Sequence, residues 1–422
     1  MASARDAASG TEGARQQPAS LWRNTSFLLL WGGQAVSAIG TQVSQLAYPL
    51  LVLALTHSPA QAGFIGAVRL IPYMLLSLPA GALVDRWNRK RVMILCDLGR
   101  ALALGSVPVA VVVGRLSLAQ LYVVSLIEGT LYVFFSLAET AALTRVVSKE
   151  QLPAATARNE TMLSTASTLG PMLSGAIYIA GRMLPFLADA ISYGVSVVSL
   201  CFIRTEFQAE RATARTGRLV AEIRAGVRWL WRQRLLRFLA VFTGGVLLVE
   251  NGYILVVIVL LQSGRGSPLP AAVTTGLVLG AGGAGSIIGS LLAEPLSARL
   301  SLRQITLGVN WSLALLLPLY LLTANPLALG LITAAAYGIT PIFFVATYSY
   351  RLSLIPDELQ GRVNSVFRLV LYAGQPIGLA LTGVLLQALA PARTVLVLTA
   401  VMLALALTAT VNADLRMARP RV

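Results

Sequence analysis

Residues 81–91 read GALVDRWNRKR and form a cluster of charge between two stretches, 60–84 and 92–114, that are almost uncharged. About 20 apolar residues are enough for a helix to cross the hydrocarbon core of a bilayer. Both stretches reach that length. The charged cluster is therefore predicted to be a short loop at a membrane surface, between two membrane helices.

Each residue type in this loop has a physical reason to be there. Gly81 lacks a side chain, which would allow a second helix to approach closely. Asp85 would be stabilised by facing an arginine or the positive end of a neighbouring helix. Asn88 is one of the few residues that tolerate a left-handed backbone. The basic side chains are expected to keep the loop on the cytoplasmic side: Arg86, Arg89, Lys90 and Arg91.

The composition excludes a soluble protein. Of 422 residues 56% are hydrophobic and only 12% are charged, which is too little polar surface to cover a soluble fold. The two cysteines, Cys96 and Cys201, both fall in apolar segments, and there is a single histidine, His57. Such a set forms neither a disulfide framework nor a metal site, so no metal and no cofactor is expected.

Twelve apolar segments predict an all-α membrane protein with twelve membrane helices. We expect a disordered cytoplasmic tail (1–22), two pseudo-symmetric six-helix bundles (23–203 and 236–412), a cytoplasmic linker (204–235) and a second tail (413–422). The predicted membrane segments are 26–55, 60–84, 92–114, 117–138, 160–181, 183–203, 236–262, 270–297, 304–323, 326–350, 363–388 and 393–412.

The basic residues set the predicted orientation. With the amino terminus inside, 27 of the 33 lysines and arginines lie in inner segments and only 4 in outer loops. Inner loops of membrane proteins are the ones enriched in lysine and arginine. Both termini are therefore predicted to be cytoplasmic. The net charge of +16 needs no nucleic-acid partner to explain it.

The linker carries a predicted amphipathic helix. Arg224, Arg228 and Arg232 recur every four residues on one face. The opposite face is apolar, and such a helix would lie on the anionic inner leaflet. A passive tether between the halves and a lipid-regulated switch both fit this pattern. The apolar face consists of Leu219, Ile223, Val227, Leu230 and Trp231.

The charged loop after the second segment resembles the signature loop of the major facilitator superfamily of secondary transporters. Its Gly-x-x-x-Asp-Arg-x-x-Arg-Lys-Arg pattern departs from the family at Asn88, where glycine is usual. The resemblance implies two six-helix halves that alternate access to a central site. It also implies that Asp85 helps close the cytoplasmic side by facing the start of the eleventh helix, near Arg362.

The two halves also resemble each other. Pro171 and Pro376 each lie twelve residues after an asparagine, Asn159 and Asn364, at corresponding places in the fifth and eleventh segments. Parallel repeats of this kind surround a central cavity in such transporters. The charged loop has no intact second copy, because Glu294 stands one place after the position that matches Asp85.

Four ionisable residues inside membrane segments are candidates for proton coupling or substrate binding: Glu128, Glu250, Asp189 and Arg69. Charges within a bilayer are costly and mark functional sites by default. Protonation of a carboxylate would remove the charge that holds a cation or an arginine. The alternative is that each carboxylate is held by a structural partner such as Arg69.

Two further sets of residues could have either a structural or a functional role. Asp97 and Arg100 lie on one helical face and, with Asp85 and Arg86, could form a charge network that latches the inner gate. A polar stripe on the first segment would suit a cavity wall or hydrogen bonds between helices: Gln34, Thr41, Gln45 and Tyr48.

The fifth segment contains Gly170, Pro171 and Gly175, and is similar to the antiporter motif of drug exporters in the superfamily. Close helix packing explains these residues as well. The stretch 221–230 and the turn 361–365 resemble the branch with the enterobactin exporter and macrolide efflux proteins. That branch implies export.

The sequence thus predicts a multi-pass transporter of the bacterial inner membrane. We expect proton-driven efflux of a bulky organic molecule such as an antibiotic, a toxic compound or a siderophore, by a monomer. A metabolite importer or facilitator of the same fold is the nearest alternative. An intramembrane enzyme is disfavoured, because the paired aspartates or histidine set that it would need are missing from the sequence.

Overall fold

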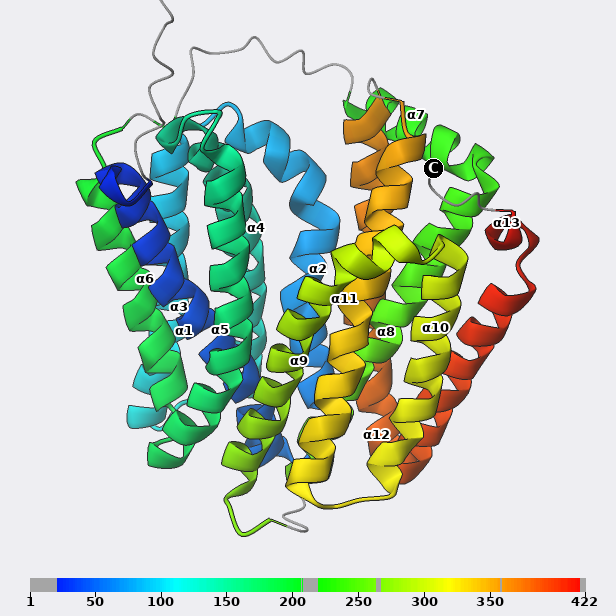
Figure 1. Ribbon diagram of the computed structural model, residues 1–422. Helices are drawn as coiled ribbons and strands as arrows, with labels where there is room; N and C mark the ends of the chain where they lie inside the picture. The colour runs from blue at the N-terminus through cyan, green and yellow to red at the C-terminus, as the bar shows by residue number, and fades with distance from the viewer. Residues whose placement is uncertain (1–20, 206, 208–218, 263–266, 357–358, 418–422) are drawn as a thin grey trace, which may run out of the picture.

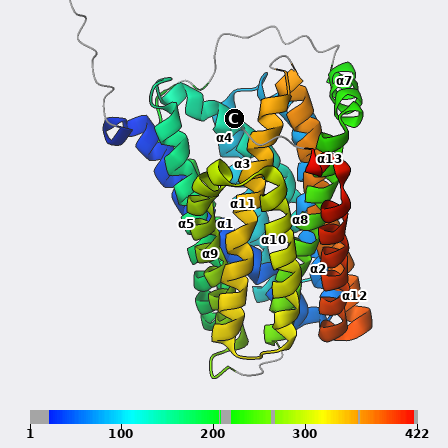
Figure 2. The same ribbon diagram turned by 45° about the vertical axis from the view of Figure 1, so that its right-hand side comes forward.

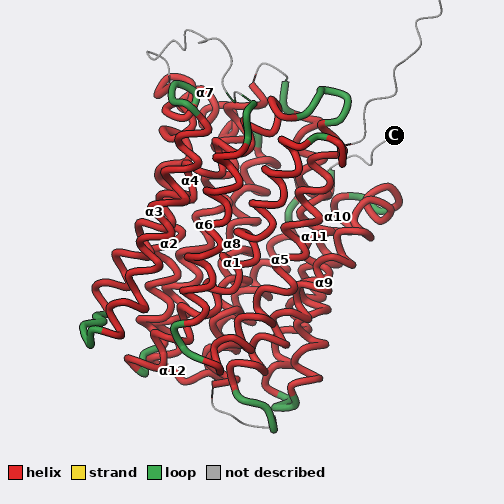
Figure 3. Tube along the Cα trace, turned by 90° about the vertical axis from the view of Figure 1, so that its left-hand side faces the viewer, coloured by secondary structure: helices red, strands yellow, loops and turns green. Residues whose placement is uncertain are grey.

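The computed structural model describes residues 21–205, 207, 219–262, 267–356 and 359–417. Over these residues the chain is helical, with no strand (Figure 3). The amino-terminal half begins with a short 3-10 helix, η1 (Leu21–Arg23). It continues with α1 (Thr25–Thr56), α2 (Pro59–Val84), α3 (Arg89–Val112), α4 (Leu118–Val146), α5 (Leu152–Ala180) and α6 (Leu184–Phe202).

The carboxyl-terminal half follows a short helix, α7 (Leu219–Arg232). It comprises α8 (Arg234–Gln262), α9 (Ala271–Arg299), α10 (Leu302–Leu316), η2 (Leu317–Leu321), α11 (Pro326–Leu354), α12 (Gln360–Val411) and α13 (Ala413–Arg416). Helix α12 contains a break at Ala390 (φ 65°), immediately before Pro391. The break divides it where the sequence predicted the boundary between its last two segments.

Ten helices in the described part of the chain are long and apolar enough to cross a membrane. The broken helix α12 counts once among them. Helix α5 falls outside the ten because serines and threonines lower the hydropathy of its apolar stretch. Each of the twelve predicted segments therefore corresponds to a helix or to one arm of α12. Helices α4 and α5 extend eight residues further than predicted, to Val146 and back to Leu152.

Local sequence explains where many of these helices start. Asn24, Ser58, Ser117 and Asn325 each precede a helix and accept a hydrogen bond from its first turn. Ser301 and Gln304 form a capping box at the start of α10. Such side chains satisfy amide groups that have no partner within the helix.

The helices pack as two groups that meet along a seam. Within the first group α1 packs on α5 and α6, α2 on α4, and α3 on α4 and α6. Within the second, α8 packs on α12, α9 on α11, and α10 on both α11 and α12. The groups contact each other where α5 meets α9 and where α2 meets α12 (Figures 1 and 2).

One end of the molecule, which we call the basic end, carries the start of α1, the 85–88 loop, α7 and α13 (Figure 1). The opposite end carries the connection between η2 and α11. Glycines allow the two groups to touch. A side chain at Gly175 would collide with the Ala272 carbonyl, and one at Gly276 would collide with the Pro171 carbonyl.

The predicted amphipathic helix is present as α7, which packs against α8 and α12, and Val227 of its apolar face is 37% exposed. Leu230 is buried, whereas Trp231 is 46% exposed and Arg224, Arg228 and Arg232 are exposed. The side chains of Leu219 and Ile223 lie outside the described part of the structure, as do residues 1–20 and 418–422 of the two predicted tails.

Candidate functional site

The charged loop is a tight connection between α2 and α3. The Asp85 amide donates to the Gly81 carbonyl at 3.1 Å and ends α2. Asn88 then caps α3, and its side chain accepts from the Arg91 amide at 3.1 Å. The φ of Asn88 is −67°, so the expected left-handed backbone is wrong: asparagine serves here as a helix cap.

The basic side chains of the loop bind the ends of other helices. Lys90 donates to the carbonyls of Ile203 at 2.7 Å and Cys201 at 3.3 Å, where α6 ends. Arg89 donates to the carbonyls of Ala141 at 3.4 Å and Phe207 at 3.3 Å. Lys90 therefore satisfies carbonyl groups that the end of α6 leaves without partners, whereas Arg89 joins α4 to the segment that follows α6.

The structure describes the predicted gate around Asp85 only in part. The Asp85 side chain is 63% exposed, and its ion pair, at 3.4 Å, is with Arg89 in the next turn. An added side chain at Gly81 would meet nothing within 4 Å, so the expected close approach is absent here. The side chain of Arg362, the implied partner of Asp85, lies outside the described residues. The gate therefore stays a prediction.

A buried polar network crosses the amino-terminal half. We use the term buried network for six residues: Thr41, Arg69, Asp97, Arg100, Glu128 and Tyr193. At its centre Oε1 of Glu128 accepts from Arg69 at 2.7 Å and lies 4.0 Å from an Nη atom of Arg100. The Glu128 side chain is 1% exposed. One carboxylate thus faces two guanidinium groups in the membrane interior.

Tyr193 joins the helices around this carboxylate. Its hydroxyl lies 3.3 Å from Glu128 Oε1 and 2.9 Å from the Thr41 hydroxyl, and it also accepts from Arg100. The guanidinium of Arg100 lies 4.0 Å from the centre of the Tyr193 ring. Cation–π contact of this kind stabilises a desolvated arginine. The network therefore combines residues from α1, α2, α3, α4 and α6.

Asp97 and Arg100 belong to this network and not to the loop. They form an ion pair at 3.4 Å, and their side chains are 0% and 2% exposed. Asp97 lies eight residues into α3, about 12 Å from its start at the loop. The expected latch of these two residues with Asp85 and Arg86 is therefore not formed here, because depth in the membrane separates them.

Asp189 sits beside the buried network on α6. It is fully buried and accepts from Ser44 at 2.5 Å and from Ser192 at 3.2 Å. It is thus held by hydroxyl groups and not by an arginine. Glu128, by contrast, is held by Arg69, the structural partner named above as the alternative to a functional role.

The predicted stripe on α1 is used for contacts between helices. Gln34 donates to Ser196 at 3.1 Å, Thr41 meets Tyr193, and the Tyr48 ring packs edge-on against Phe186 at 5.0 Å. These partners all lie on α6. Gln45 is exposed. The structure therefore favours the second interpretation of the stripe, hydrogen bonding and packing between helices.

The packing motif on α5 lies between two neighbours. Gly170 touches Gln42 of α1, whereas Gly175 touches Ala272 of α9. Pro171 faces Gly276 of α9. The motif thus contributes both to the first group of helices and to the seam.

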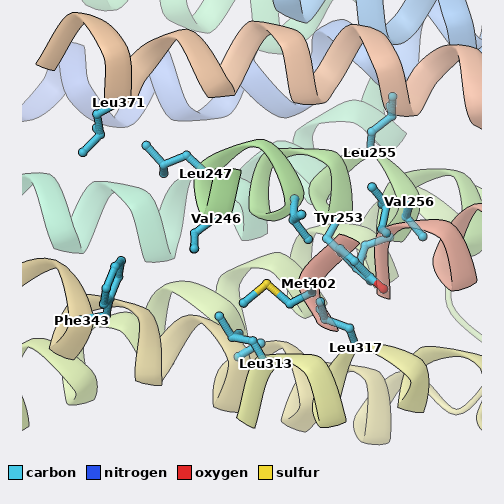
Figure 4. Packing of buried hydrophobic residues seen from close by; sticks show 14 of the residues in the cluster. Val246, Leu247, Tyr253, Leu255, Val256, Leu313, Leu317, Phe343, Leu371 and Met402 are labelled. Carbon is cyan, nitrogen blue, oxygen red and sulfur yellow. The ribbon is translucent and has the colours of Figure 1, made fainter. Parts of the chain in front are cut away.

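Glu250 lies in the carboxyl-terminal half, away from any described ion pair. Its Oε2 atom is buried without a hydrogen-bond partner, and so is the hydroxyl of Tyr337 nearby. Both residues line a cavity with about 20 Å³ of room, enough for a single water. The rest of the lining is largely apolar, and Figure 4 shows Val246, Tyr253, Leu313, Leu317 and Met402 converging there.

Two arginines of the carboxyl-terminal half were missed as site residues, because they had been counted as orientation signals. Arg351, in the last turn of α11, is only 4% exposed, and its guanidinium lies 4.1 Å from the Phe367 ring and 5.0 Å from the Tyr348 ring. Arg368 of α12 reaches across the seam and donates to the Tyr73 hydroxyl on α2.

Tyr193 was missed as well, although the sequence contains a signal for it. Asp189, Ser192, Tyr193 and Ser196 are polar and recur at helical spacing in an otherwise apolar segment. Among the described residues, no group of three or more metal-binding side chains comes together.

Comparison with known proteins gives consistent matches. The sequence model of the Major Facilitator Superfamily matches residues 30–309. The chain is 28% identical to the multidrug efflux pump Tap of Mycolicibacterium fortuitum, over 92% of this chain and 95% of the relative. It is 22% identical to macrolide efflux protein A of Streptococcus pyogenes, over 84% and 88%.

Among solved structures, the nucleoside transporter NupG superposes with a TM-score of 0.72 over 91% of this chain and 98% of NupG, at 13% identity. At this identity the likeness concerns the fold alone. It agrees with the helical architecture described above.

Proposed function

This chain belongs to the major facilitator superfamily, and from that premise we propose that it is an efflux transporter driven by the proton gradient. It is a multi-pass membrane protein that moves small molecules, and it is a transporter and not an enzyme. Efflux of a bulky organic compound is supported by relatives named as efflux proteins, which match over most of the chain.

The observation that carries proton coupling is the position of Glu128. This carboxylate is 1% exposed and is bound to Arg69 at 2.7 Å beside a second arginine. Protonation would cancel the charge that holds both guanidinium groups, and the helices that carry them, α2, α3 and α4, would then be free to rearrange. Proton uptake is thereby linked to a change in helix packing.

The cell membrane of a bacterium is the proposed location, with both termini in the cytoplasm. The location of α1, α7 and α13 at one end supports a common side for these segments. The count of basic residues supports the cytoplasm as that side. We propose that the monomer, embedded in the lipid bilayer, is the functional unit.

The test uses acidified inside-out vesicles that contain the protein, challenged with a panel of antibiotics, dyes and siderophores. A transported compound is expected to release protons with the wild type and to release none with Glu128→Gln or Glu250→Gln. Unchanged proton release in both variants would remove these carboxylates from the mechanism.

An importer or facilitator remains the second candidate, and the same compounds distinguish it. Export predicts lower accumulation of the compound in intact cells that make the protein than in cells that make Glu128→Gln. Higher accumulation in the wild type would overturn export.

A further inference from the structure

We propose that Arg351 and Arg368, together with the tyrosines around them, form a subsite for the anionic group of an aromatic substrate. We call this set the seam subsite: Tyr73, Tyr132, Tyr348, Arg351, Arg368 and Tyr372. The inference deepens the proposed function, since it rests on transport and names the chemical class of what is carried.

The two arginines lie close together, and neither is paired with an acid among the described residues. Arg351 is within electrostatic range of Arg368 and of Tyr372. Within the described residues, neither guanidinium forms an ion pair, and the Nε atom of the buried Arg351 has no hydrogen-bond partner. Two adjacent positive charges inside a membrane protein are costly unless an anion compensates them.

One described acid lies near this region. Glu160 of α5 is exposed and lies within electrostatic range of Tyr372, but it pairs with neither arginine. Among the side chains that the structure describes in this region, two cations thus lie near one exposed carboxylate. This balance favours an anionic occupant over a cationic one.

Aromatic rings surround these charges on both sides of the seam. Tyr73 of α2 packs edge-on against Tyr372 of α12, with ring centres 5.4 Å apart, and lies 6.5 Å from Tyr132 of α4. The guanidinium of Arg368 lies 5.9 Å from Tyr73 and 5.8 Å from Tyr372. Rings arranged in this way can stack on a planar ligand.

The subsite is open to a ligand. Tyr132 and Tyr348 are 45% and 53% exposed, and Arg368 is exposed. Arg368 lies eight residues after the start of α12, about 12 Å in from the basic end. A ligand at this depth would contact α2 and α4 of one half and α11 and α12 of the other. Its binding would therefore respond to the relative position of the halves.

Arginine is the suitable cation for this task. Its planar guanidinium binds carboxylate or phenolate oxygens through paired hydrogen bonds and also stacks on aromatic faces. The chemistry thus points to a flat aromatic compound with a carboxylate or phenolate group.

The test measures equilibrium binding of two dyes to the purified full-length protein in lipid nanodiscs. Fluorescein is an anionic xanthene, and a cationic rhodamine has the same ring system. The wild type is expected to bind fluorescein more tightly than the rhodamine. The variant with Arg351→Gln and Arg368→Gln is expected to lose fluorescein affinity by about tenfold or more, since hydrogen bonds to charged groups contribute about 1.5–3 kcal/mol each. Its rhodamine affinity should be unchanged or higher.

Two controls separate charge recognition from folding. Arg368→Lys keeps the charge and should retain most of the preference for fluorescein. Arg234→Gln removes an exposed arginine at the start of α8 and should change neither affinity. Equal weakening of both dyes in the double variant would assign the arginines a purely structural role and overturn the proposal.

The proposal would also be overturned if the wild type bound the rhodamine more tightly, or bound neither dye. The assay measures binding without a proton gradient or a direction of transport. Its failure would therefore leave the proposed efflux intact, and a silent vesicle assay would leave the seam subsite intact.

Discussion

In the amino-terminal half the arginines of the membrane helices pair with acids as well as with aromatic rings, whereas in the carboxyl-terminal half the buried Arg351 contacts rings and forms no ion pair among the described residues. Arg69 and Arg100 are paired with Glu128 and Asp97. Arg351 instead contacts two rings. The one buried acid of the second half that we singled out, Glu250, has an oxygen without a partner.

The two halves thus have interiors of different chemistry within one helical bundle. The compensated network holds its helices together for as long as the Glu128 carboxylate is charged. Arg351, Arg368 and Glu250 form no ion pair among the described residues. The free energy of their surroundings therefore depends on a proton, a water or a ligand that compensates the charge. The interior of the first half is thus suited to holding its helices together. The interior of the second half is suited to binding a proton, a water or a ligand.

The largest effect that would test this comparison is on stability. Glu128→Gln leaves Arg69 and Arg100 facing a neutral group, and breaking a buried ion pair in this way costs about 3–5 kcal/mol. Glu250→Gln replaces a carboxylate that forms no ion pair among the described residues, and should leave stability unchanged or raise it. Thermal denaturation in detergent, followed by the loss of monodisperse protein, compares the two. Equal destabilisation by both would refute the contrast between the halves.

A smaller effect is expected from a matched pair of tyrosines. Tyr193→Phe removes a hydroxyl that contacts Thr41, Arg100 and Glu128, and should destabilise the protein by about 1–3 kcal/mol, because buried partners lose their hydrogen bonds. Tyr337→Phe removes a buried hydroxyl that has no partner in the described structure, and should cost nothing.

The same denaturation measurement applies to both tyrosine variants, with ring packing preserved in each. If Tyr337→Phe proved the more damaging change, the cavity around Glu250 would have to contain a bound partner for that hydroxyl. Glu250 and Tyr337 would then no longer differ from the paired residues of the first half.

The smallest effect on stability is expected in the loops. Asp85 is largely exposed, and Glu294, which stands near the corresponding place in the second half, is also exposed. Asp85→Asn and Glu294→Gln should each change stability by less than about 0.5 kcal/mol. Only Asp85→Asn is expected to slow transport, measured as initial efflux rate at matched protein levels. Full activity of Asp85→Asn would remove it from the gate.

Sequence patterns predicted the helices well, because burial in a bilayer imposes a length and a polarity that single segments must meet. The break at Ala390 was placed between the last two segments for the same reason. Helix ends at the basic end were less predictable: α4 and α5 continue as polar helices beyond the apolar stretches.

Partners inside the bundle could not be predicted in the same way. Periodicity fixes which residues share a face, but not how each helix is rotated against its neighbours. Asp97 and Arg100 were correctly placed on one face, yet Arg100 points to Glu128 and Tyr193, and Asp97 pairs with Arg100 and not with the loop. Arg351 was treated as a loop charge, because its burial depends on Phe367, sixteen residues further along the chain.

The contacts of Arg89 and Lys90 with the helix ends give the first half a mechanical property. Lys90 donates a hydrogen bond to the carbonyl of Ile203, where α6 ends. Arg89 donates to a carbonyl of α4 and also pairs with Asp85. The same α6 carries Tyr193 and Asp189 deep in the membrane. We therefore expect a displacement of the loop to shift α4 and α6 with it. The surface turn, Tyr193 and Asp189 would then move together.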